Sequence, residues 1–421
     1  MVDNICIFED VNYLRLLPLV YFRPVYDLRC GILTLREKVL KQYQGIPVSL
    51  HCRSYLKGLV EQQNPNLKVN EFSGKNCLFI NGRIIVDDKL KAKISLEGEN
   101  KVYFKGDTCI AVKASGSKLD KIKHQLSDLF SLSSFDGFEK EEIDANIINY
   151  PWNLVNANGG QIVADFKILT NDIKDDKIKG NIYEGAYLLN RDNIYIGSGS
   201  KIKPGVVLDA EKGPIYIGNN VEVYPNSTIE GPVFIGDDSK IKAGAKIYED
   251  TSIGPVCKVG GEVESSIIHS HSNKQHDGFL GHSYLGMWVN LGADTNNSDL
   301  KNNYSNVKVT INNEQIDSGS MFVGLIIGDH SKSGINTMFN TGTVVGVFSN
   351  IYGGGFPRKY IPSFSWGGSE SLITYKIDKS VEVAKRVMNR RKIEITEIDK
   401  ELMKKVFDLT KEERIKQGMS E

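Results

Sequence analysis

One aliphatic residue recurs every six positions through the middle of the chain. This spacing matches neither the 3.6-residue period of a helix nor the two-residue alternation of a strand. It is typical of a parallel β-helix, in which one aliphatic side chain per short strand points into the interior. The anchors are Ile196, Ile202 and Leu208, then Ile217, Val223, Ile229, Ile235, Ile241, Ile247, Ile253 and Val259. Because one coil cannot bury its apolar face alone, we expect the coils to stack into a solenoid.

The six-residue phase changes between Gly260 and Ile326, where the sequence becomes more polar. Four of the seven His residues fall within this stretch, from His269 to His282. Six-residue steps reappear at Leu285 and Leu291, and later run from Met321 through Ile327 to Ile351. Insertions in a solenoid gather on one face, and that face commonly binds ligands. We therefore expect the repeat to be interrupted here and the functional site to lie in the interruption.

Three interpretations of these His residues remain open. His269 and His271 are two apart and would point the same way from a strand, as a metal pair requires, although no Cys and few carboxylates stand nearby. Each His is also explained as a polar turn residue bonded to backbone. One of them could instead be a general base, because imidazole titrates near neutral pH and can take a proton from an attacking amine.

The chain divides into three regions. We expect an α/β domain with a helical linker over residues 1–185, the parallel β-helix over 186–368, and a C-terminal helical tail over 369–421. Helical spacing over Thr34–Tyr43 predicts a helix, and the charged stretch 119–149 is predicted to be helical as well. The predicted strands of the first region are Ile5–Phe8, Cys77–Ile80, Arg83–Val86, Lys101–Phe104 and Cys109–Val112.

Composition excludes several classes of protein. Lys plus Arg equals Asp plus Glu at 52 each, so no net charge draws the chain to nucleic acid or to a membrane surface. The six Cys residues form no Cys-x-x-Cys pair, which argues against a zinc site and a disulfide framework. No apolar run is long enough to span a membrane, and the opening residues look like a buried strand rather than a signal peptide. We expect a cytoplasmic protein.

Two segments of the polar stretch resemble a known family. Gln275–Gly281 (QHDGFLG) and Val289–Thr295 (VNLGADT) are similar to the acetyltransferase half of the bifunctional UDP-N-acetylglucosamine pyrophosphorylase/glucosamine-1-phosphate acetyltransferases. In that family a His precedes Tyr-Leu-Gly, and Val-Asn-Ile-Gly-Ala-Gly-Thr follows about one coil later. The resemblance implies a left-handed β-helix, His276 as the general base for a sugar amine, and Asn290 as a contact to sugar or cofactor. Phe279 stands where the family has its Tyr.

The same resemblance implies acetyl-CoA as co-substrate and a sugar phosphate as acceptor, both of which carry phosphate groups. Basic residues should therefore flank the site, and Lys274 beside His276 and Lys242 are the candidates, with Tyr304 as a further contact. Asp294 departs from the Gly of the family. Such acyltransferases bind the coenzyme between adjacent solenoids, which implies a homotrimer.

The segment after the first strand carries Pro and several Arg but no glycine loop. It runs over Leu14–Lys38 (LRLLPLVYFRPVYDLRCGILTLREK) and resembles the sugar-1-phosphate nucleotidyltransferase-like domain that precedes such solenoids in related proteins. The resemblance implies that a nucleoside triphosphate and a sugar phosphate bind here. We expect Arg15, Arg23 and Arg29 to contact phosphate, and Asn81, at the end of a predicted strand, to line the site.

A metal ion is the harder question for this domain. Mg²⁺ normally bridges the phosphates in nucleotidyl transfer and is held by carboxylates. Arg83 occupies the place where the family carries its metal-binding Asp, so Asp87 or Asp88 would have to substitute. The segment 152–158 resembles the strand that carries the second metal ligand, which places Asn156 or Asn158 near the site, with Asn158 as the metal-ligand candidate.

The prediction is a transferase of activated amino-sugar synthesis. It would N-acetylate glucosamine 1-phosphate or a similar sugar with acetyl-CoA, and would transfer a uridylyl group, with Mg²⁺ if that second activity is retained. Two alternatives stay open. One is a nucleotidyltransferase whose solenoid only assembles the oligomer, and the other is a non-catalytic scaffold that binds sugar nucleotides.

Overall fold

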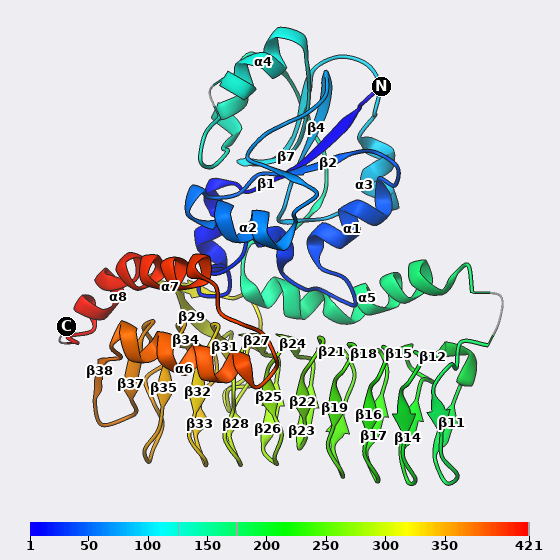
Figure 1. Ribbon diagram of the computed structural model, residues 1–421, viewed down its shortest axis with the longest axis vertical. Helices are drawn as coiled ribbons and strands as arrows, with labels where there is room; N and C mark the ends of the chain where they lie inside the picture. Colours follow the sequence, from blue (N-terminus) through cyan, green and yellow to red (C-terminus); the bar gives the residue numbers. More distant parts are fainter. Residues whose placement is uncertain (125, 174–175, 420–421) are drawn as a thin grey trace.

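The computed structural model describes residues 1–124, 126–173 and 176–419. An α/β domain rests on one side of a long solenoid, and C-terminal helices return along the solenoid to meet the α/β domain (Figure 1). The α/β domain, the left-handed parallel β-helix and the helical C-terminus confirm the predicted fold class.

The α/β domain is built on a seven-stranded sheet with the order β3-β2-β1-β4-β7-β6-β8. β1, β2, β3 and β4 are parallel, β7 runs antiparallel to β4 and β6, and β8 is parallel to β6. From β1 the chain builds outward on one side to β2 and β3, and then crosses to add β4 on the other side of β1. The bounds are β1 (Asn4–Phe8), β2 (Val48–Leu50), β3 (Lys68–Val69), β4 (Asn76–Asn81), β6 (Lys101–Lys105), β7 (Thr108–Ser115) and β8 (Glu139–Glu142).

Short helices connect and cover these strands. The predicted helix at Thr34–Tyr43 is confirmed as α1, which begins after Thr34 because the Thr34 hydroxyl and the Glu37 carboxylate cap the first turn reciprocally. The helices are η1 (Val11–Leu16), η2 (Val25–Asp27), α1 (Leu35–Gln42), η3 (Ser54–Leu56), α2 (Lys57–Gln63), α3 (Asp88–Lys93), α4 (Gly116–His124) and η4 (Leu132–Phe135).

The prediction of a helix across 119–149 was wrong for most of that stretch. α4 ends at His124, and the chain then forms η4, β8 and β9 (Asn146–Ile147), which pairs with β5 (Ile84–Ile85). Ser131 caps η4 and bonds Ser133 and Ser134. Ser hydroxyls compete with helical hydrogen bonds in this way, so charge pattern alone did not extend the helix.

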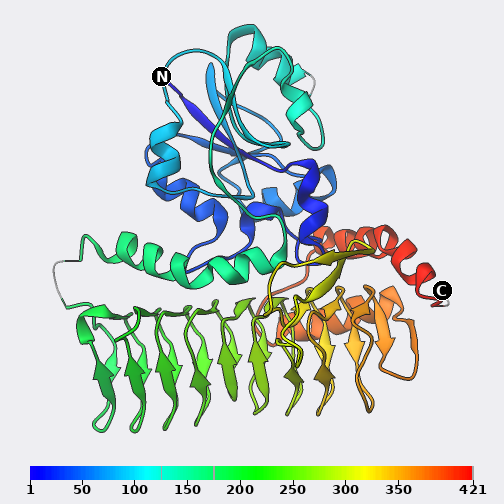
Figure 2. The ribbon, with the colours of Figure 1, turned by 180° about the vertical axis from the view of Figure 1, so that it is seen from behind.

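α5 (Pro151–Thr170) links the domain to the solenoid and lies along one of its faces (Figure 2). The segment 152–158 is therefore helical, which corrects the expected strand. Pro151 at the first helical position has no N–H to leave unpaired, and the Asn153 side chain accepts the N–H of Tyr150. Gly159 faces the solenoid so closely that a Cβ there would overlap the carboxylate of Asp250.

Each coil of the solenoid contributes a short strand to each of three parallel faces. The first face holds β10 (Asn181–Ile182), β13 (Lys201–Ile202), β16 (Glu222–Val223), β19 (Lys240–Ile241), β22 (Lys258–Val259) and β25 (Asn273–Lys274). The second holds β11 (Tyr187–Leu189), β14 (Val207–Asp209), β17 (Thr228–Glu230), β20 (Lys246–Ile247), β23 (Glu262–Glu264) and β26 (Phe279–Gly281). The third holds β12 (Ile194–Ile196), β15 (Ile215–Ile217), β18 (Val233–Ile235), β21 (Thr251–Ile253), β24 (Ile267–Ser270), β27 (Tyr284–Met287), β31 (Ile326–Ile327), β34 (Val344–Val345) and β36 (Tyr360–Ile361).

The last coils extend the faces with fewer strands. Asn290 bridges β25 to β32 and so continues the first face. These strands are β32 (Lys332–Ser333), β35 (Asn350–Ile351), β37 (Ser365–Gly367) and β38 (Leu372–Thr374) on the first face, and β28 (Asn296–Asn297) with β33 (Met338–Phe339) after the second. The six-residue anchors Ile196 to Val259 are all buried inside the coils.

The coils do not stop at Gly260, which corrects the expected interruption. β22 to β27 stay in parallel register with the coils before them. The six-residue pattern disappears because the coil after Val259 is shorter than the coils before it: Val263 pairs with Ile247 and Ile268 pairs with Ile253. Lys274 then pairs with the anchor Val259 and takes an inward position, where its ammonium donates to the carbonyls of Gly260 and His276. The insertion comes later, after Asp299, as the hairpin β29 (Lys308–Ile311) and β30 (Glu314–Asp317).

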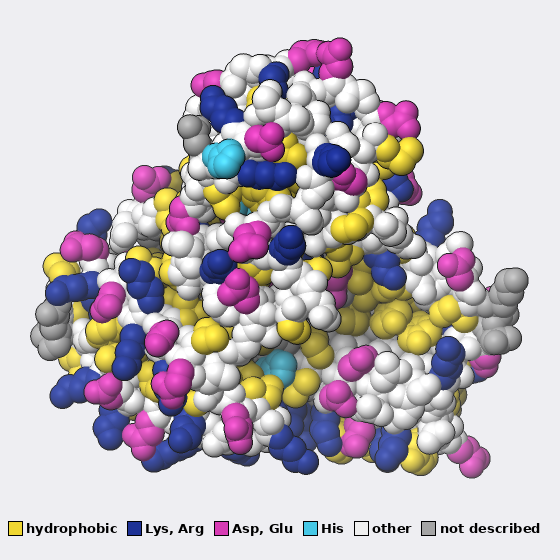
Figure 3. Space-filling model, turned by 45° about the horizontal axis from the view of Figure 1, so that its top comes forward, with side chains coloured by type: hydrophobic (Ala, Val, Ile, Leu, Met, Phe, Trp, Pro, Cys, Tyr) yellow, Lys and Arg dark blue, Asp and Glu magenta, His cyan; other side chains and the backbone are white. Residues whose placement is uncertain are grey.

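The C-terminal region forms α6 (Ile377–Asn389), α7 (Glu397–Leu409) and α8 (Lys411–Lys416). α7 packs against α2 and η3 of the α/β domain. A single hydrophobic core runs from β1 through the third face to α7, and a buried ion pair between Arg23 and Asp329 also joins the two parts. Among the described residues no helix is long and apolar enough to cross a bilayer. Acidic and basic side chains are intermixed on the face seen in Figure 3.

Candidate functional site

The strand order of the α/β sheet marks one place for a ligand. The direction of sheet growth reverses between β1 and β4, and ligands of open α/β sheets bind outside the carboxyl ends of the strands at such a switch point. Glu9 and Asp10 follow β1, Arg53 lies just beyond β2, and Asn81 and Arg83 stand at the end of β4. All five side chains are buried.

Asp10 and Arg83 form a buried ion pair at this point. Arg83 Nε and Nη2 donate to the two carboxylate oxygens of Asp10 at 2.8 and 2.5 Å, and Asn81 Nδ2 donates to Asp10 Oδ2 at 2.9 Å. The remaining nitrogen, Arg83 Nη1, donates to the Ile148 carbonyl and to Asn149 Oδ1, both at 3.0 Å. The bidentate geometry holds the two strand ends together.

A second buried pair stands beside the first. Arg53 Nε donates to Glu9 Oε2 at 3.0 Å and Arg53 Nη2 to Glu9 Oε1 at 3.1 Å. Glu9 also accepts the backbone N–H groups of Val25 and Arg53. The Arg53 guanidinium carbon lies 4.1 Å from the centroid of the Tyr13 ring. Both carboxylates that follow β1 are thus neutralised by Arg residues of the neighbouring strands.

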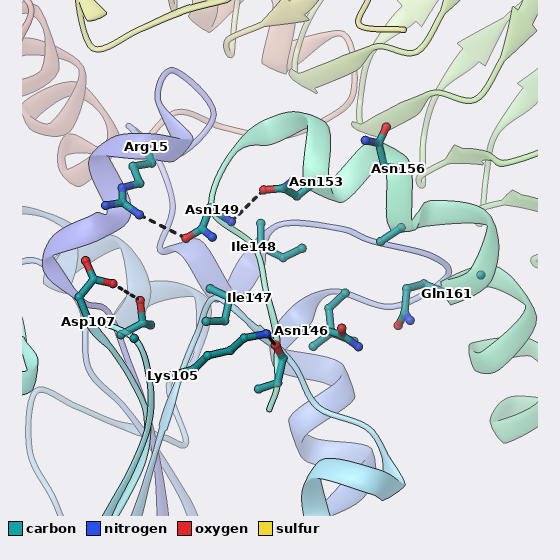
Figure 4. Close-up of a pocket in the computed structure, with 16 residues that line it drawn as sticks. Arg15, Lys105, Asp107, Asn146, Ile147, Ile148, Asn149, Asn153, Asn156 and Gln161 are labelled. Carbon is teal, nitrogen blue, oxygen red and sulfur yellow. Dashed lines mark hydrogen bonds between the residues drawn. The ribbon is translucent and has the colours of Figure 1, made fainter. Parts of the chain in front are cut away.

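A pocket of about 740 Å³ opens beside Asp10 and Arg83 (Figure 4). It lies between η1, the β6–β7 turn, the segment around β9 and the first half of α5. Arg15 of η1 points to Asn149, with 3.4 Å between Arg15 Nη1 and Asn149 Oδ1. The polar residues that line it are Arg15, Lys105, Asp107, Thr108, Asn146, Asn149, Asn153, Asn156 and Gln161. Its volume suits a nucleotide-sized ligand, and its amides offer donors and acceptors for a base or a sugar.

The residues at this pocket do not fit a protein-held Mg²⁺ ion. Both carboxylate oxygens of Asp10 accept hydrogen bonds from Arg83 and Asn81. Among the described residues that line the pocket, Asp107 alone carries a carboxylate. Asp87 caps α3 through the N–H of Leu90 and does not line the pocket. Two or more convergent carboxylate oxygens would be expected around such an ion.

The predicted residues of the α/β domain separate into two groups. Arg15 lines the pocket and Asn81 supports it from beneath through Asp10. Arg23 and Arg29 face the solenoid instead: Arg23 pairs with Asp329, and Arg29 donates to the Ile32 carbonyl. Asn158 also leaves the pocket, because its amide bonds the Gly31 N–H and the Asp250 carbonyl. Arg23, Arg29 and Asn158 therefore bond other parts of the protein rather than face the pocket. Sequence spacing alone could not distinguish such residues from residues that contact a ligand.

On the solenoid, three titratable side chains meet at the corner between the second and third faces. Glu264 ends β23, His282 follows β26 and Asp299 follows β28, so three successive coils each place one residue there. Their ligand atoms lie within 4.8 Å of one another. His282 Nδ1 and Asp299 Oδ2 are 2.8 Å apart, and the imidazole stacks on Phe322 with ring centroids 4.8 Å apart.

The electrostatics of this cluster favour a proton-accepting imidazole. An Asp299 carboxylate at Nδ1 holds the proton on that nitrogen, so Nε2 keeps its lone pair. The His282 side chain is 21% exposed, which leaves it within reach of a substrate. Burial and the charge of Asp299 raise the pKa of Glu264 above its ordinary value, with a smaller opposing effect of His282.

The sequence carried a signal for His282 that the expected alignment missed. His282 precedes Tyr284-Leu285-Gly286 by two residues, and so fits the His before Tyr-Leu-Gly of the family better than His276, which precedes Phe279-Leu280-Gly281. Tyr284 is itself buried, and its hydroxyl accepts the Arg29 N–H at 3.0 Å. The coil that leads to His276 is shorter than the coils before it, which displaced the expected phase.

The structure disperses the other predicted residues of the solenoid. His276 lies exposed in a turn, and Lys274 beside it is buried with its ammonium on backbone carbonyls. Lys242 lies over the ring of Tyr224, 5.0 Å from its centroid. Tyr304 is 67% exposed. Asn290 lines a separate cavity on the first face and accepts a hydrogen bond from Asn273 Nδ2 at 3.3 Å.

The His269–His271 metal pair is not formed. His269 is buried and its Nε2 lies 2.9 Å from the Asp27 carbonyl oxygen, in contact with the α/β domain. His271 follows in the left-handed conformation, with φ of 54°, and turns its ring onto Trp288. The two side chains therefore leave the strand in different directions.

Both parts of the chain match known families. The family described as sugar nucleotidyl transferase matches residues 5–174, and the six-repeat bacterial transferase hexapeptide family matches residues 214–248. A bifunctional sugar-1-phosphate nucleotidylyltransferase/acetyltransferase from Sulfurisphaera tokodaii is 26% identical over 384 residues, which are 80% of this chain and 88% of that protein. The chain is a homologue of these bifunctional transferases.

Other similar proteins match shorter parts of the chain. The bifunctional protein GlmU of Methanococcus aeolicus is 29% identical over 241 residues, which cover 57% of this chain and 47% of that protein. The chain thus matches about half the length of GlmU. Among solved structures, the UDP-N-acetylglucosamine acyltransferase of Francisella novicida is 17% identical with a TM-score of 0.30, over 51% of this chain and 70% of that one. The proteins that this chain resembles are named as transferases.

Proposed function

We propose that this chain is a bifunctional enzyme of activated amino-sugar synthesis. At the pocket beside Arg83 it would join a sugar 1-phosphate to the nucleotidyl group of a nucleoside triphosphate. At the His282 corner it would transfer the acyl group of acetyl-CoA to the amine of an amino-sugar phosphate. The observation that carries the proposal is the His282–Asp299 pair, which stands on a hexapeptide solenoid behind a sugar nucleotidyl transferase domain.

The acyl transfer follows from the state of the imidazole. His282 Nε2 takes a proton from the amine as the amine nitrogen attacks the thioester carbonyl, and Asp299 stabilises the imidazolium that forms. The C–S bond then breaks and coenzyme A leaves with a proton. Glu264 lies beside the imidazole, and its carboxyl group can accept a hydrogen bond from the imidazolium when it is ionised.

The nucleotidyl transfer uses the first pocket. A phosphate oxygen of the sugar 1-phosphate attacks the α-phosphorus of the nucleotide in line with the leaving diphosphate. Arg15 borders the pocket with its guanidinium and contacts the developing charge, while the Asn residues of β9 and α5 hold the uncharged groups. No step is assigned to a protein-held metal ion.

The acyl-transfer site is tested with a matched pair of His variants. His282→Ala is expected to lower release of coenzyme A from acetyl-CoA and glucosamine 1-phosphate by about 10²- to 10⁴-fold, the range of general base catalysis. His276→Ala is the control and should retain wild-type turnover, because His276 lies in an exposed turn. A chelator should leave the wild-type rate unchanged. Loss of turnover in His276→Ala with full activity in His282→Ala would reverse the assignment.

The nucleotidyl site is tested in the same full-length chain. Arg15→Met should lower diphosphate release from nucleoside triphosphate and sugar 1-phosphate by about 10²-fold or more, while acyl transfer continues. His282→Ala should show the opposite pattern. Binding of a sugar nucleotide by the wild type without any diphosphate release would favour the non-catalytic scaffold for this domain, a reading that the buried Asp10–Arg83 pair supports.

Homotrimer assembly stays a prediction. It is expected to show in solution as a mass close to three times that of the 46.9 kDa chain.

A further inference from the structure

A second cavity lies between the first face of the solenoid and α6. It has a volume of about 260 Å³. Four residues on successive coils form the floor, each beside the next: Lys258 (β22), Asn273 (β25), Asn290 and Lys332 (β32). Asn290 bridges Asn273 to Lys332 but belongs to no strand itself. The end of α6 forms the roof with Arg390 and Arg391.

The charge of this cavity is of one sign. Lys258, Lys332, Arg390 and Arg391 line it, and none of the residues around it is acidic. Within the described part of the chain, none of these four cations forms an ion pair with a carboxylate. Four positive charges around one enclosed space repel each other unless an anion lies between them.

The polar groups of the cavity are only partly satisfied by the protein. Arg391 Nη2 donates to Asn273 Oδ1 at 2.9 Å, and Lys332 Nζ donates to the His330 carbonyl at 2.8 Å. His271, which also lines the cavity, has a buried Nδ1 without a hydrogen-bond partner. A buried polar atom without a partner costs free energy that a bound ligand recovers.

Burial acts on the same cations. Burial lowers the pKa of Lys332 to about 8. Burial and the positive charge of Arg391 both lower the pKa of Lys258. An anion in the cavity would offset both effects, because it stabilises the charged ammonium groups.

The cavity is distinct from both candidate active sites. Each coil has three faces, and the His282 cluster stands at the corner between the second and third, opposite the first face. The nucleotide pocket belongs to the α/β domain and shares no lining residue with the cavity.

We propose that this cavity binds a phosphate-class anion, either free phosphate or diphosphate or the phosphate group of a small ester. Lys258, Lys332, Arg390 and Arg391 neutralise its charge, and Asn273 and Asn290 offer amide hydrogen-bond groups to it. The volume admits a phosphate, a diphosphate or a small phosphate ester and is too small for a whole nucleotide. The bound anion fastens α6 to the solenoid.

The test is calorimetric titration of the full chain with inorganic phosphate, with diphosphate and with glucosamine 1-phosphate, at an ionic strength held constant with chloride. We expect saturable binding of at least one of the three, accompanied by a change in the emission of Trp288, which also lines the cavity. Lys332→Met and Arg391→Met should each weaken that binding by about tenfold or more.

The control is Arg386→Met, which removes an exposed cation of the same helix that pairs with Glu382. It should bind like the wild type, because Arg386 does not line the cavity. Tightest binding by the inorganic ions identifies a free anion as the ligand, and tightest binding by the sugar phosphate identifies an ester. The proposal fails if the wild type shows no saturable binding, or if Lys332→Met and Arg391→Met both bind as tightly as the wild type.

Discussion

Single side chains decide the character of both candidate sites. Asp10 and Glu9 would be ordinary acidic residues at a strand end if Arg83 and Arg53 did not neutralise them inside the sheet edge. A buried charge that loses its partner is strongly destabilising, so these Arg residues hold the site together as well as shaping it. At the His282 corner the charges remain partly exposed, which suits a group that exchanges protons with a substrate.

Glu264 provides a test at this scale. The raised pKa of Glu264 means that its carboxyl group binds a proton more tightly in the folded chain than in the unfolded chain. Protonated Glu264 therefore favours the folded state. This contribution to stability is present below the ordinary pKa of Glu and is lost as pH rises through the raised pKa. Glu264→Gln removes this loss. The free energy of unfolding of the variant, relative to wild type, should therefore increase as pH rises from the ordinary pKa of a Glu side chain through the raised pKa of Glu264.

Urea denaturation at several pH values measures this difference. Glu262→Gln serves as the control, because that carboxylate lies two residues away and pairs with Lys246. Glu262→Gln should not increase the free energy of unfolding at high pH. A difference between Glu264→Gln and wild type that is constant across the pH range would contradict the role of the raised pKa.

At the scale of elements, α5 is the joint between the α/β domain and the solenoid. Its buried side holds Asn158, Gly159 and Asp165, and Asp165 accepts hydrogen bonds from Lys38 and from the N–H groups of Ile32 and Leu33. This helix therefore orients the Leu14–Lys38 segment, and with it Arg15, over the nucleotide pocket.

Two adjacent glycines of α5 give a matched pair. A Cβ at Gly159 would overlap the Asp250 carboxylate, whereas nothing lies within 4 Å of a Cβ at Gly160. Gly160→Ala should stabilise the chain by up to about 1 kcal/mol, because Ala has the higher helix propensity. Gly159→Ala should destabilise it by about 1–3 kcal/mol, the usual range for overpacking. Chemical denaturation measures both, and equal effects of the two substitutions would refute the close contact of α5 with the solenoid.

At the scale of the whole molecule, a hydrophobic cluster of the α/β domain extends onto the third face of the solenoid, and the buried Arg23–Asp329 pair joins the same two parts, while the interior of the solenoid forms a separate core. We expect this shared buried contact to couple the unfolding of the two parts. Calorimetry should show a single thermal transition for the full chain, and Arg23→Met should lower its stability by about 3–5 kcal/mol while the transition stays single. Two separate transitions in the wild type would contradict this coupling.

Much of the fold was predictable because its signals are local. The six-residue anchors of the solenoid, the strands at Ile5–Phe8 and Cys77–Ile80 and the capped helix after Thr34 each follow from residues close in sequence. The candidate site was predicted less well. The family resemblance pointed to His276 as the base, whereas the structure brings His282 together with Glu264 and Asp299. Which of the two His residues acts as the base stays a prediction.

The sequence by itself determined that the chain forms a solenoid behind an α/β domain, because periodicity and strand patterns report on burial residue by residue. Only the tertiary structure decided which polar residues lie together in the candidate sites. Arg15 and Arg23 lie eight positions apart in one basic segment, yet one borders a pocket and the other is buried against Asp329. Glu264, His282 and Asp299 meet because the coils stack. Contacts between distant segments depend on the path of the chain, which local residue patterns do not encode.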